Sequence, residues 1–193
     1  MIAAIEGTLE FRGAQWAIVK VGGVSLQIYL PTSTLTQLGA VGERVQLYTH
    51  LHWREDNVAL YGFLSQQELD LFKMLISVNG VGPKLALAML SNLNPEQLVL
   101  AIASGDINLL TQLPGIGKKT ANRLVLELKG KLEKGGAGVV SSYLTQDNAE
   151  IIAVLTNLGY SASEATKAVA TLPSSATLAL EDKIKLALQY LAK

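Results

Sequence analysis

The sequence has no cysteine among its 193 residues. This absence excludes disulfide bonds, thiol chemistry and zinc sites built on cysteine. It also has no apolar run of about 18 residues, the length that a membrane-spanning helix needs. Its first residues, Met1-Ile2-Ala3-Ala4-Ile5, do not show the basic start and long apolar run of a signal peptide. We therefore expect a soluble, cytoplasmic protein.

An excess of charge of either sign is missing as well. The chain has 16 basic and 16 acidic residues, so no global basic signature points to nucleic acid. Any nucleic-acid footprint must therefore be local. Hydrophobic residues make up 49% of the chain, which is enough for a packed core.

Residues 1–64 have the pattern of β-structure. Residues 24–30 and 45–53 alternate apolar and polar side chains, and glycines separate the alternating segments. About five short strands in this length suit a small closed barrel, such as an OB-fold. An SH3-like barrel would give the same pattern.

The period changes at residue 65, and residues 65–134 predict short helices. Ser65 and Glu68 form a capping box, and Pro95 after Asn94 marks another helix start. Residues 135–146 are rich in glycine and serine and predict a flexible linker. Residues 147–193 predict a bundle of three short helices, the second of which opens with a capping box of Ser161 and Glu164.

The helical middle contains an internal repeat of the form G-(V/I)-G-x-K-x-A. Gly80-Val81-Gly82-Pro83-Lys84-Leu85-Ala86 matches Gly115-Ile116-Gly117-Lys118-Lys119-Thr120-Ala121, and each copy connects two helical segments. The two glycines allow a tight turn with positive φ, and they let a phosphate approach the backbone. The central Val or Ile can anchor the turn in the core, and the alanine lets the two helices approach.

The helix that follows each turn supplies the attraction for an anion. Its first N–H groups are unpaired, its dipole favours negative charge there, and a lysine adds positive charge. Residues 65–134 carry 8 basic and 6 acidic residues, whereas each flanking segment carries 4 basic and 5 acidic ones. Ordinary glycine turns are the alternative, but two matched copies favour sequence-independent, salt-sensitive binding of phosphate backbone.

Other chemistries find less support. The second copy resembles a Walker A motif, but Gln112 stands where its first glycine belongs. Glu55 with Asp56, and His50 with His52, give too few ligands for a metal site, and a polar hairpin tip explains the two acids. Four aromatic residues could stack on single strands: Trp16, Tyr29, Tyr48 and Trp53. Trp16 and Trp53 fall in phase with apolar neighbours, which favours core packing instead. We expect no catalytic residue, metal or cofactor.

The order of these segments resembles the RuvA family over nearly the whole chain. The resemblance is carried by Leu47-Tyr48-Thr49-His50, Arg54-Glu55-Asp56, Leu60-Tyr61-Gly62-Phe63, Asn79 to Leu87 and Leu113 to Ala121. It implies an α+β multidomain protein with an OB-fold barrel at 1–64. A tandem helix–hairpin–helix domain at 65–134, a linker at 135–146 and a UBA-like three-helix domain at 147–193 follow. The linker and tail are short, which leaves the partner-contacting residues less defined.

The resemblance also implies roles for particular residues. The DNA-binding residues would be Asn79, Gly80, Gly82, Lys84, Gly115, Gly117, Lys118, Lys119 and Arg123. Glu55 and Asp56 would form an acidic pin that repels phosphate at the centre of a four-way junction, in place of the plain hairpin tip. The tail would bind the RuvB motor, with apolar contacts expected from Leu155, Leu158, Tyr160 and Leu191.

The function that the resemblance implies is structure-specific binding of Holliday junctions in recombination and repair. The chain would be a non-catalytic subunit that forms a homotetramer, or an octamer on DNA. It would recruit and stimulate the hexameric RuvB ATPase for branch migration and share the junction with the RuvC resolvase. Two alternatives remain from the residues alone: a DNA-processing enzyme that uses the hairpins as a handle, and a structural scaffold without a nucleic-acid partner.

Overall fold

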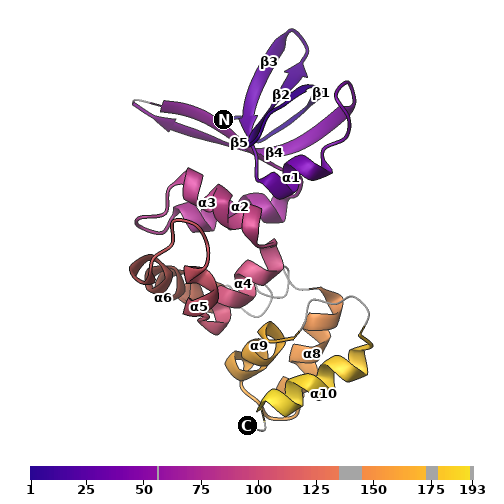
Figure 1. The fold of residues 1–193 in the computed structure, drawn as a ribbon, viewed down its shortest axis with the longest axis vertical. Coiled ribbons are helices and arrows are strands. Elements are labelled where there is room, and N and C mark those ends of the chain that lie inside the picture. The colour runs from indigo at the N-terminus through magenta and orange to yellow at the C-terminus, as the bar shows by residue number, and fades with distance from the viewer. Residues whose placement is uncertain (56, 135–144, 173–177, 192–193) are drawn as a thin grey trace. The chain divides into compact units, whose positions relative to one another are not determined.

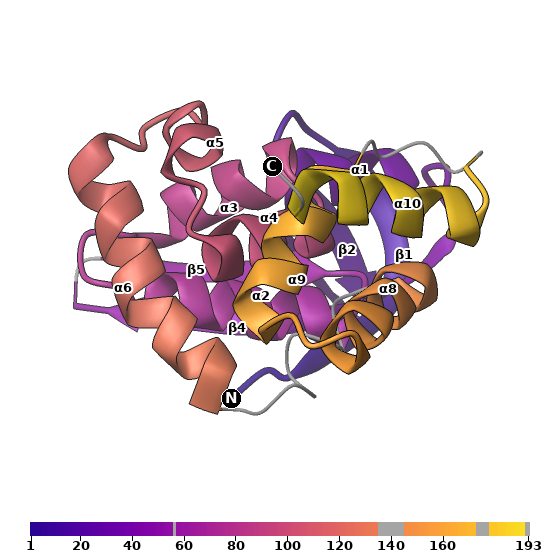
Figure 2. The ribbon, with the colours of Figure 1, turned by 90° about the horizontal axis from the view of Figure 1, so that it is seen from below.

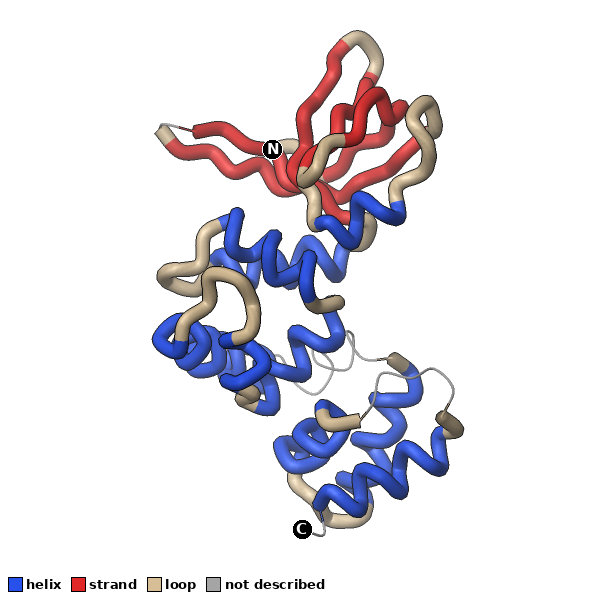
Figure 3. The backbone as a smooth tube through the Cα atoms, viewed as in Figure 1, coloured by secondary structure: helices blue, strands red, loops and turns tan. Residues whose placement is uncertain are grey.

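The computed structural model describes residues 1–55, 57–134, 145–172 and 178–191. The chain divides into two compact units, Met1–Ser77 with Val81–Asn94, and Val78–Gly80 with Pro95–Lys193. The strands come from the first part of the chain, and helices make up the regular structure after it (Figure 3).

The first unit contains the predicted barrel. Its strands are β1 (Ala4–Arg12), β2 (Trp16–Val21), β3 (Val24–Tyr29), β4 (Arg44–Arg54) and β5 (Asn57–Phe63). They close in the order β1-β2-β3-β5-β4, and β3 pairs with β5 in parallel while the other pairs are antiparallel. This OB-like barrel confirms the predicted fold class. A short helix between β3 and β4, α1 (Thr32–Gln37), was not predicted.

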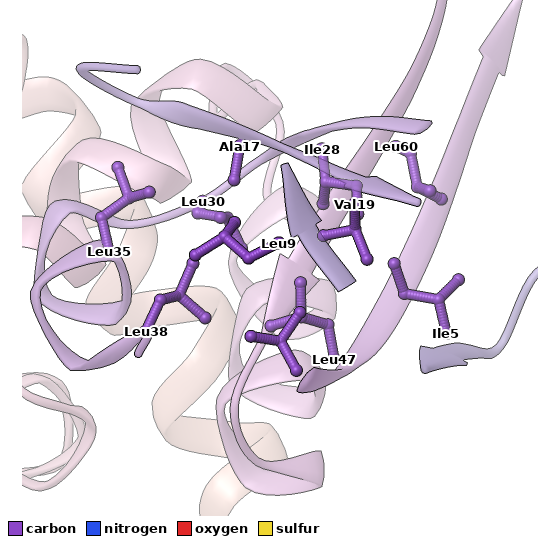
Figure 4. Packing of buried hydrophobic residues seen from close by; sticks show 11 residues of the cluster. Ile5, Leu9, Ala17, Val19, Ile28, Leu30, Leu35, Leu38, Leu47 and Leu60 are labelled. Carbon is purple, nitrogen blue, oxygen red and sulfur yellow. The ribbon is translucent and has the colours of Figure 1, made fainter. Parts of the chain in front are cut away.

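Alternating side chains fill the barrel. Leu9, Val19, Ile28 and Leu47 are fully buried and point toward one another (Figure 4). Burial of each such side chain contributes about 1.5–3 kcal/mol. The period-2 pattern therefore predicts the core because one face of every strand is removed from water.

The β4–β5 hairpin continues beyond the rest of the barrel (Figure 1). Burial declines along one face of β4, from Leu47 through Leu51 to Trp53, which is 75% exposed. Val58, its cross-strand partner, is 59% exposed. The prediction that Trp53 packs in the core is therefore wrong. Its phase in the strand is correct, but the 11-residue strand is longer than the barrel that it helps to close.

Two helices complete the first unit, α2 (Gln66–Ile76) and α3 (Pro83–Asn92). The predicted cap of α2 is present, since the Ser65 hydroxyl accepts from the Glu68 N–H at 3.1 Å. Burial raises the pKa of the Glu68 carboxyl, which accepts from the Leu64 N–H. Phe72 packs α2 on the outer face of the hairpin, with its ring 4.9 Å from that of Phe63.

The second unit begins with α4 (Pro95–Ser104), α5 (Ile107–Thr111) and α6 (Lys118–Lys134). The predicted helix start at Pro95 is confirmed. Leu98, Val99 and Ile102 of α4 are fully buried. Asp106 caps α5 by accepting from the Leu109 N–H at 2.9 Å.

The tail folds into the three predicted helices, α8 (Gln146–Asn157), α9 (Ala162–Ala170) and α10 (Leu180–Leu191), which lie together (Figures 1 and 2). The capping box of Ser161 and Glu164 is confirmed, and Gly159 ends α8 with a φ of +99°. Leu100 of α4 belongs to the same core cluster as the tail. Of the predicted linker, residues 135–144 lie outside the described residues, and Gln146 is already helical.

In the described part of the chain, no single helix is long and apolar enough to cross a membrane, although α3 and α4 pass that test of length and composition as a bent pair.

The close packing of β1 against β2 can be tested at Gly7. A β-carbon at Gly7 would overlap the carbonyl oxygen of Lys20 on β2, whereas one at Gly23 would meet no atom within 4 Å. We predict that Gly7→Ala lowers the free energy of unfolding by about 1–3 kcal/mol, because the paired backbones must separate. The matched control Gly23→Ala should change it by less than about 0.5 kcal/mol. Urea denaturation measures both, and equal losses would contradict this account.

Candidate nucleic-acid interface

The first glycine turn connects α2 to α3. Gly80 has a φ of +90°, a left-handed conformation that favours glycine. Val81 is buried and anchors the turn, as predicted, and Ala86 is fully buried on α3. The Gly82 carbonyl accepts from the Ala86 N–H at 3.0 Å and so begins the helix.

The second turn has the same construction between α5 and α6. Gly115 has a φ of +81°, Ile116 is buried, and Ala121 is fully buried. The Gly117 carbonyl accepts from the Ala121 N–H at 2.9 Å. The sequence repeat is therefore a structural repeat, in which residues at equivalent positions share backbone conformation, burial and hydrogen bonding.

The second glycine of each turn differs from the expectation that both supply positive φ. Gly82 has a φ of −86°, and Gly117 also lies outside the positive region. A β-carbon would meet nothing within 4 Å at either position. The fold itself does not require glycine at these two positions. A ligand that approaches the backbone from outside would require it.

Positive charge gathers where these helices begin. Lys84 lies in the first turn of α3, and Lys118 and Lys119 open α6; all three are exposed. Neither first turn contains an acidic residue, whereas those of α2, α4, α8, α9 and α10 do. Cations at this end oppose the helix dipole and cost helix stability. No side chain caps α3, so its N–H groups remain available for an external anion.

Arg123 has a partner within the protein. Its Nη1 donates to the carbonyl of Asn79 at 2.9 Å, and its Nε lies 3.9 Å from Glu127. The guanidinium thus stabilises the loop that holds Gly80. No feature of the sequence signalled this contact. The Asn79 side chain is exposed.

The acidic residues lie at the tip of the β4–β5 hairpin. Glu55 is exposed, and Asp56 lies outside the described residues. The β4–β5 hairpin extends away from the rest of the barrel (Figure 1), and Glu55 follows the last residue of β4.

No group of three metal-binding side chains occurs in the described part of the chain, so His50 and His52 have no third ligand there. His50 lies on the outer face of β4, 5.7 Å from the Phe72 ring, and burial lowers its pKa. Trp16 is half-buried and stacks on Phe11 at 5.1 Å.

The four tail residues expected to contact a partner differ in exposure. Leu155 is fully buried in the bundle, and Tyr160 and Leu191 pack against that core. Leu158 is 59% exposed at the end of α8. It therefore presents the largest apolar surface of the four.

Comparisons with known proteins agree with this arrangement. Three family models match successive parts of the chain: "RuvA N terminal domain" at residues 1–62, "SAM-like Helix-hairpin-helix tandem" at 72–131 and "RuvA, C-terminal domain" at 146–192.

Full-length relatives match as well. The chain is 50% identical to a protein of Dehalococcoides mccartyi over 190 residues, covering 98% of each chain. It is 47% identical to a protein of Herpetosiphon aurantiacus over 196 residues, again covering 98% of each. Both relatives carry the name "Holliday junction branch migration complex subunit RuvA".

The different roles of the two glycines in each turn can be measured. We predict that Gly115→Ala lowers the free energy of unfolding by about 1–2 kcal/mol, because alanine is strained at positive φ. Gly117→Ala should cost only about 0.5 kcal/mol, the difference between glycine and alanine at a helix N-cap. Urea denaturation followed by circular dichroism compares the two variants, and a loss at Gly117 as large as that at Gly115 would refute the distinction.

Proposed function

The chain belongs to the RuvA family, and we propose that it binds four-way DNA junctions through sequence-independent contacts to backbone phosphates. The observation that carries this proposal is the pair of helix N-termini at Gly82 and Gly117. Each combines exposed lysine, a glycine that the fold does not need, and a first turn without acidic residues. Phosphate is the ligand that fits all three features.

The same turns explain why binding would be independent of sequence. Backbone N–H groups and lysine ammonium groups recognise phosphate oxygens, which are the same at every nucleotide. The DNA-binding residues that we propose remain those of the two turns and their flanks: Asn79, Gly80, Gly82, Lys84, Gly115, Gly117, Lys118 and Lys119. For Arg123 we propose a positioning role through Asn79 in addition to its charge.

Selectivity for a junction requires a second element, and we assign it to the acidic pin at Glu55 and Asp56. Four copies of the chain around one junction would gather these carboxylates at its centre, where they repel phosphate. A duplex lying across the same face would meet that repulsion along its backbone, whereas the separated strands of an open junction would avoid it. Closed cyclic symmetry is an ordinary arrangement for identical chains.

The tail would connect the junction to the motor. We propose that α8, α9 and α10 bind the RuvB ATPase, with Leu158 as the most exposed apolar contact. In this scheme the chain itself performs no catalysis, and ATP hydrolysis comes from RuvB. The RuvC resolvase would act on the same junction.

Salt dependence tests the phosphate contacts. We predict that Lys84→Ala and Lys119→Ala each weaken binding to a four-way junction and to a linear duplex alike. The plot of log affinity against log salt should flatten by about 0.9 for each lost contact in each subunit. Gel shifts across a salt series measure both changes. Lys185→Ala, which removes an exposed lysine of the tail, is the charge-matched control and should leave the slope unchanged. An unchanged slope in the two turn variants would refute phosphate binding by these lysines.

Neutralising the pin should have the opposite effect. We predict that the double variant Glu55→Gln, Asp56→Asn keeps its affinity for the junction and gains affinity for duplex, because like-charge repulsion is relieved. Glu6→Gln, at another exposed acid of the barrel, is the control. Gel shifts on both DNAs at one salt concentration give the ratio of affinities. Loss of junction binding in the double variant would instead make the pin a ligand or a structural group.

A further inference from the structure

The first unit contains a cavity of about 680 Å³ between the barrel and α3. Its volume falls within the range of about 300–1,000 Å³ that is usual for small-molecule sites. Six of the lining side chains supply its chemistry: Gln15, Trp16, Tyr29, Asn57, Tyr61 and Lys84. They comprise three aromatic rings, two amides and one ammonium group.

The walls of this cavity are fixed in place. The Thr32 N–H donates to the Ser91 hydroxyl at 3.0 Å, and the Ser33 hydroxyl donates to the Leu90 carbonyl at 3.0 Å, so α1 is tied to the end of α3. On the barrel side, Trp16 and Tyr29 are cross-strand partners on β2 and β3. Most of the cavity wall therefore belongs to strands and helices, and Ala14 and Gln15 come from the connection between β1 and β2.

The aromatic groups are arranged along one side. The Tyr29 and Tyr61 rings lie 5.7 Å apart across the parallel β3–β5 pair. Tyr61 is buried, whereas Tyr29 and Trp16 are half-buried and retain surface toward solvent. Rings with exposed surface beside a cation form the combination by which proteins hold an unpaired base and its phosphate.

The position of the cavity connects two elements of the proposed function. Asn57 pairs with Arg54 across the hairpin, next to Glu55 at the tip. Lys84 lies in the first turn of α3, directly after the Gly80–Gly82 turn. The cavity is thus bounded by Asn57, which follows the acidic pin in the sequence, and by Lys84 of the proposed first phosphate site.

We propose that this cavity binds one unpaired nucleotide, with the base against Trp16 and Tyr29 and its phosphate at Lys84. The amides of Gln15 and Asn57 would meet the polar edge of the base. This inference rests on the proposed function, because it takes the nucleotide from a DNA strand at the crossover of a junction. Bases there lose their partners as strands are exchanged, and the cavity would hold one of them out of the duplex.

A junction with one unpaired base tests the proposal. Full-length protein is bound to a four-way junction that carries a single unpaired 2-aminopurine at its centre, and to the same junction fully paired. We expect quenching of the 2-aminopurine emission and about tenfold tighter binding to the unpaired form, in line with the stacking of one base on aromatic side chains.

Two substitutions connect the effect to the cavity. Tyr29→Leu keeps apolar volume but removes the ring, and should abolish the quenching and the tenfold preference while the fully paired junction binds as before. Gln15→Glu, at an exposed side chain, should do the same, because it replaces the amide donor at the edge of the base with a carboxylate and adds negative charge to a site for an anionic nucleotide. It keeps the test valid if Tyr29→Leu fails to fold. Preference and quenching that persist in both variants overturn the proposal.

A second arm separates a DNA base from a free nucleotide. The chain has two tryptophans, so Trp53→Phe leaves Trp16 as the only tryptophan reporter. Deoxyadenosine 5′-monophosphate should quench Trp16 emission, and Tyr29→Leu should weaken that quenching. If the free nucleotide quenches Trp16 emission but the unpaired base changes neither 2-aminopurine emission nor junction affinity, the proposal that the nucleotide comes from DNA is overturned. Loss of the quenching by free nucleotide as the protein concentration rises would show that a second copy fills the cavity, and would overturn the proposal.

The two arms also separate failure of this inference from failure of the proposed function. Normal binding of the paired junction without preference for the unpaired base overturns the cavity alone. Absence of binding to any junction overturns the proposed function, and the proposed source of the nucleotide with it.

Discussion

A helix leaves the N–H groups of its first turn without partners, and α3 and α6 each begin directly after a turn whose geometry is set by one left-handed glycine. Gly80 and Gly115 reverse the chain so that Val81 and Ile116 point into the core. The helix start is thereby held at the surface by a buried anchor one residue away. Lysine beside the unpaired N–H groups completes the anion site that we propose, and the core fixes its position. The exposed charges depend on this constraint, because without the anchor they would be mobile side chains on a loop.

The two repeats share this construction but do not offer equal sites. Pro83 is the first residue of α3, so that helix start lacks one N–H donor and carries one lysine. α6 begins with Lys118 and Lys119 and keeps every donor. The second turn therefore presents both more N–H groups and more charge to a phosphate. The first turn has Lys84, which also lines the neighbouring cavity that we propose as a nucleotide site.

The local sequence pattern was sufficient to predict the structure wherever a residue's role depends on its near neighbours. The alternation of residues 24–30 predicts the face of β3 that enters the barrel, and the capping pairs at Ser65 and Ser161 predict where α2 and α9 begin. The repeat predicts both turns because its spacing and its glycines are local. Trp53 was misplaced because the end of the barrel is set by the other strands, which the sequence of β4 does not contain. The bond from Arg123 to the Asn79 carbonyl joins residues 44 positions apart, and no periodicity encodes it.

The two faces of the β4–β5 hairpin explain how a barrel can present an acidic tip at a distance. On the outer face, His50 and Tyr61 pack against Phe72 of α2, so the base of the hairpin is supported by a helix. On the inner face, the apolar row that fills the barrel continues to Trp53 and Val58, which are exposed and which no other described strand covers. A two-stranded ribbon is marginal in water by itself. This one is stable at its base because it is continuous with a closed barrel, and its free end is where Glu55 lies. The same continuity places Asn57 at the edge of the cavity, so the pin and the proposed nucleotide site are held by one pair of strands.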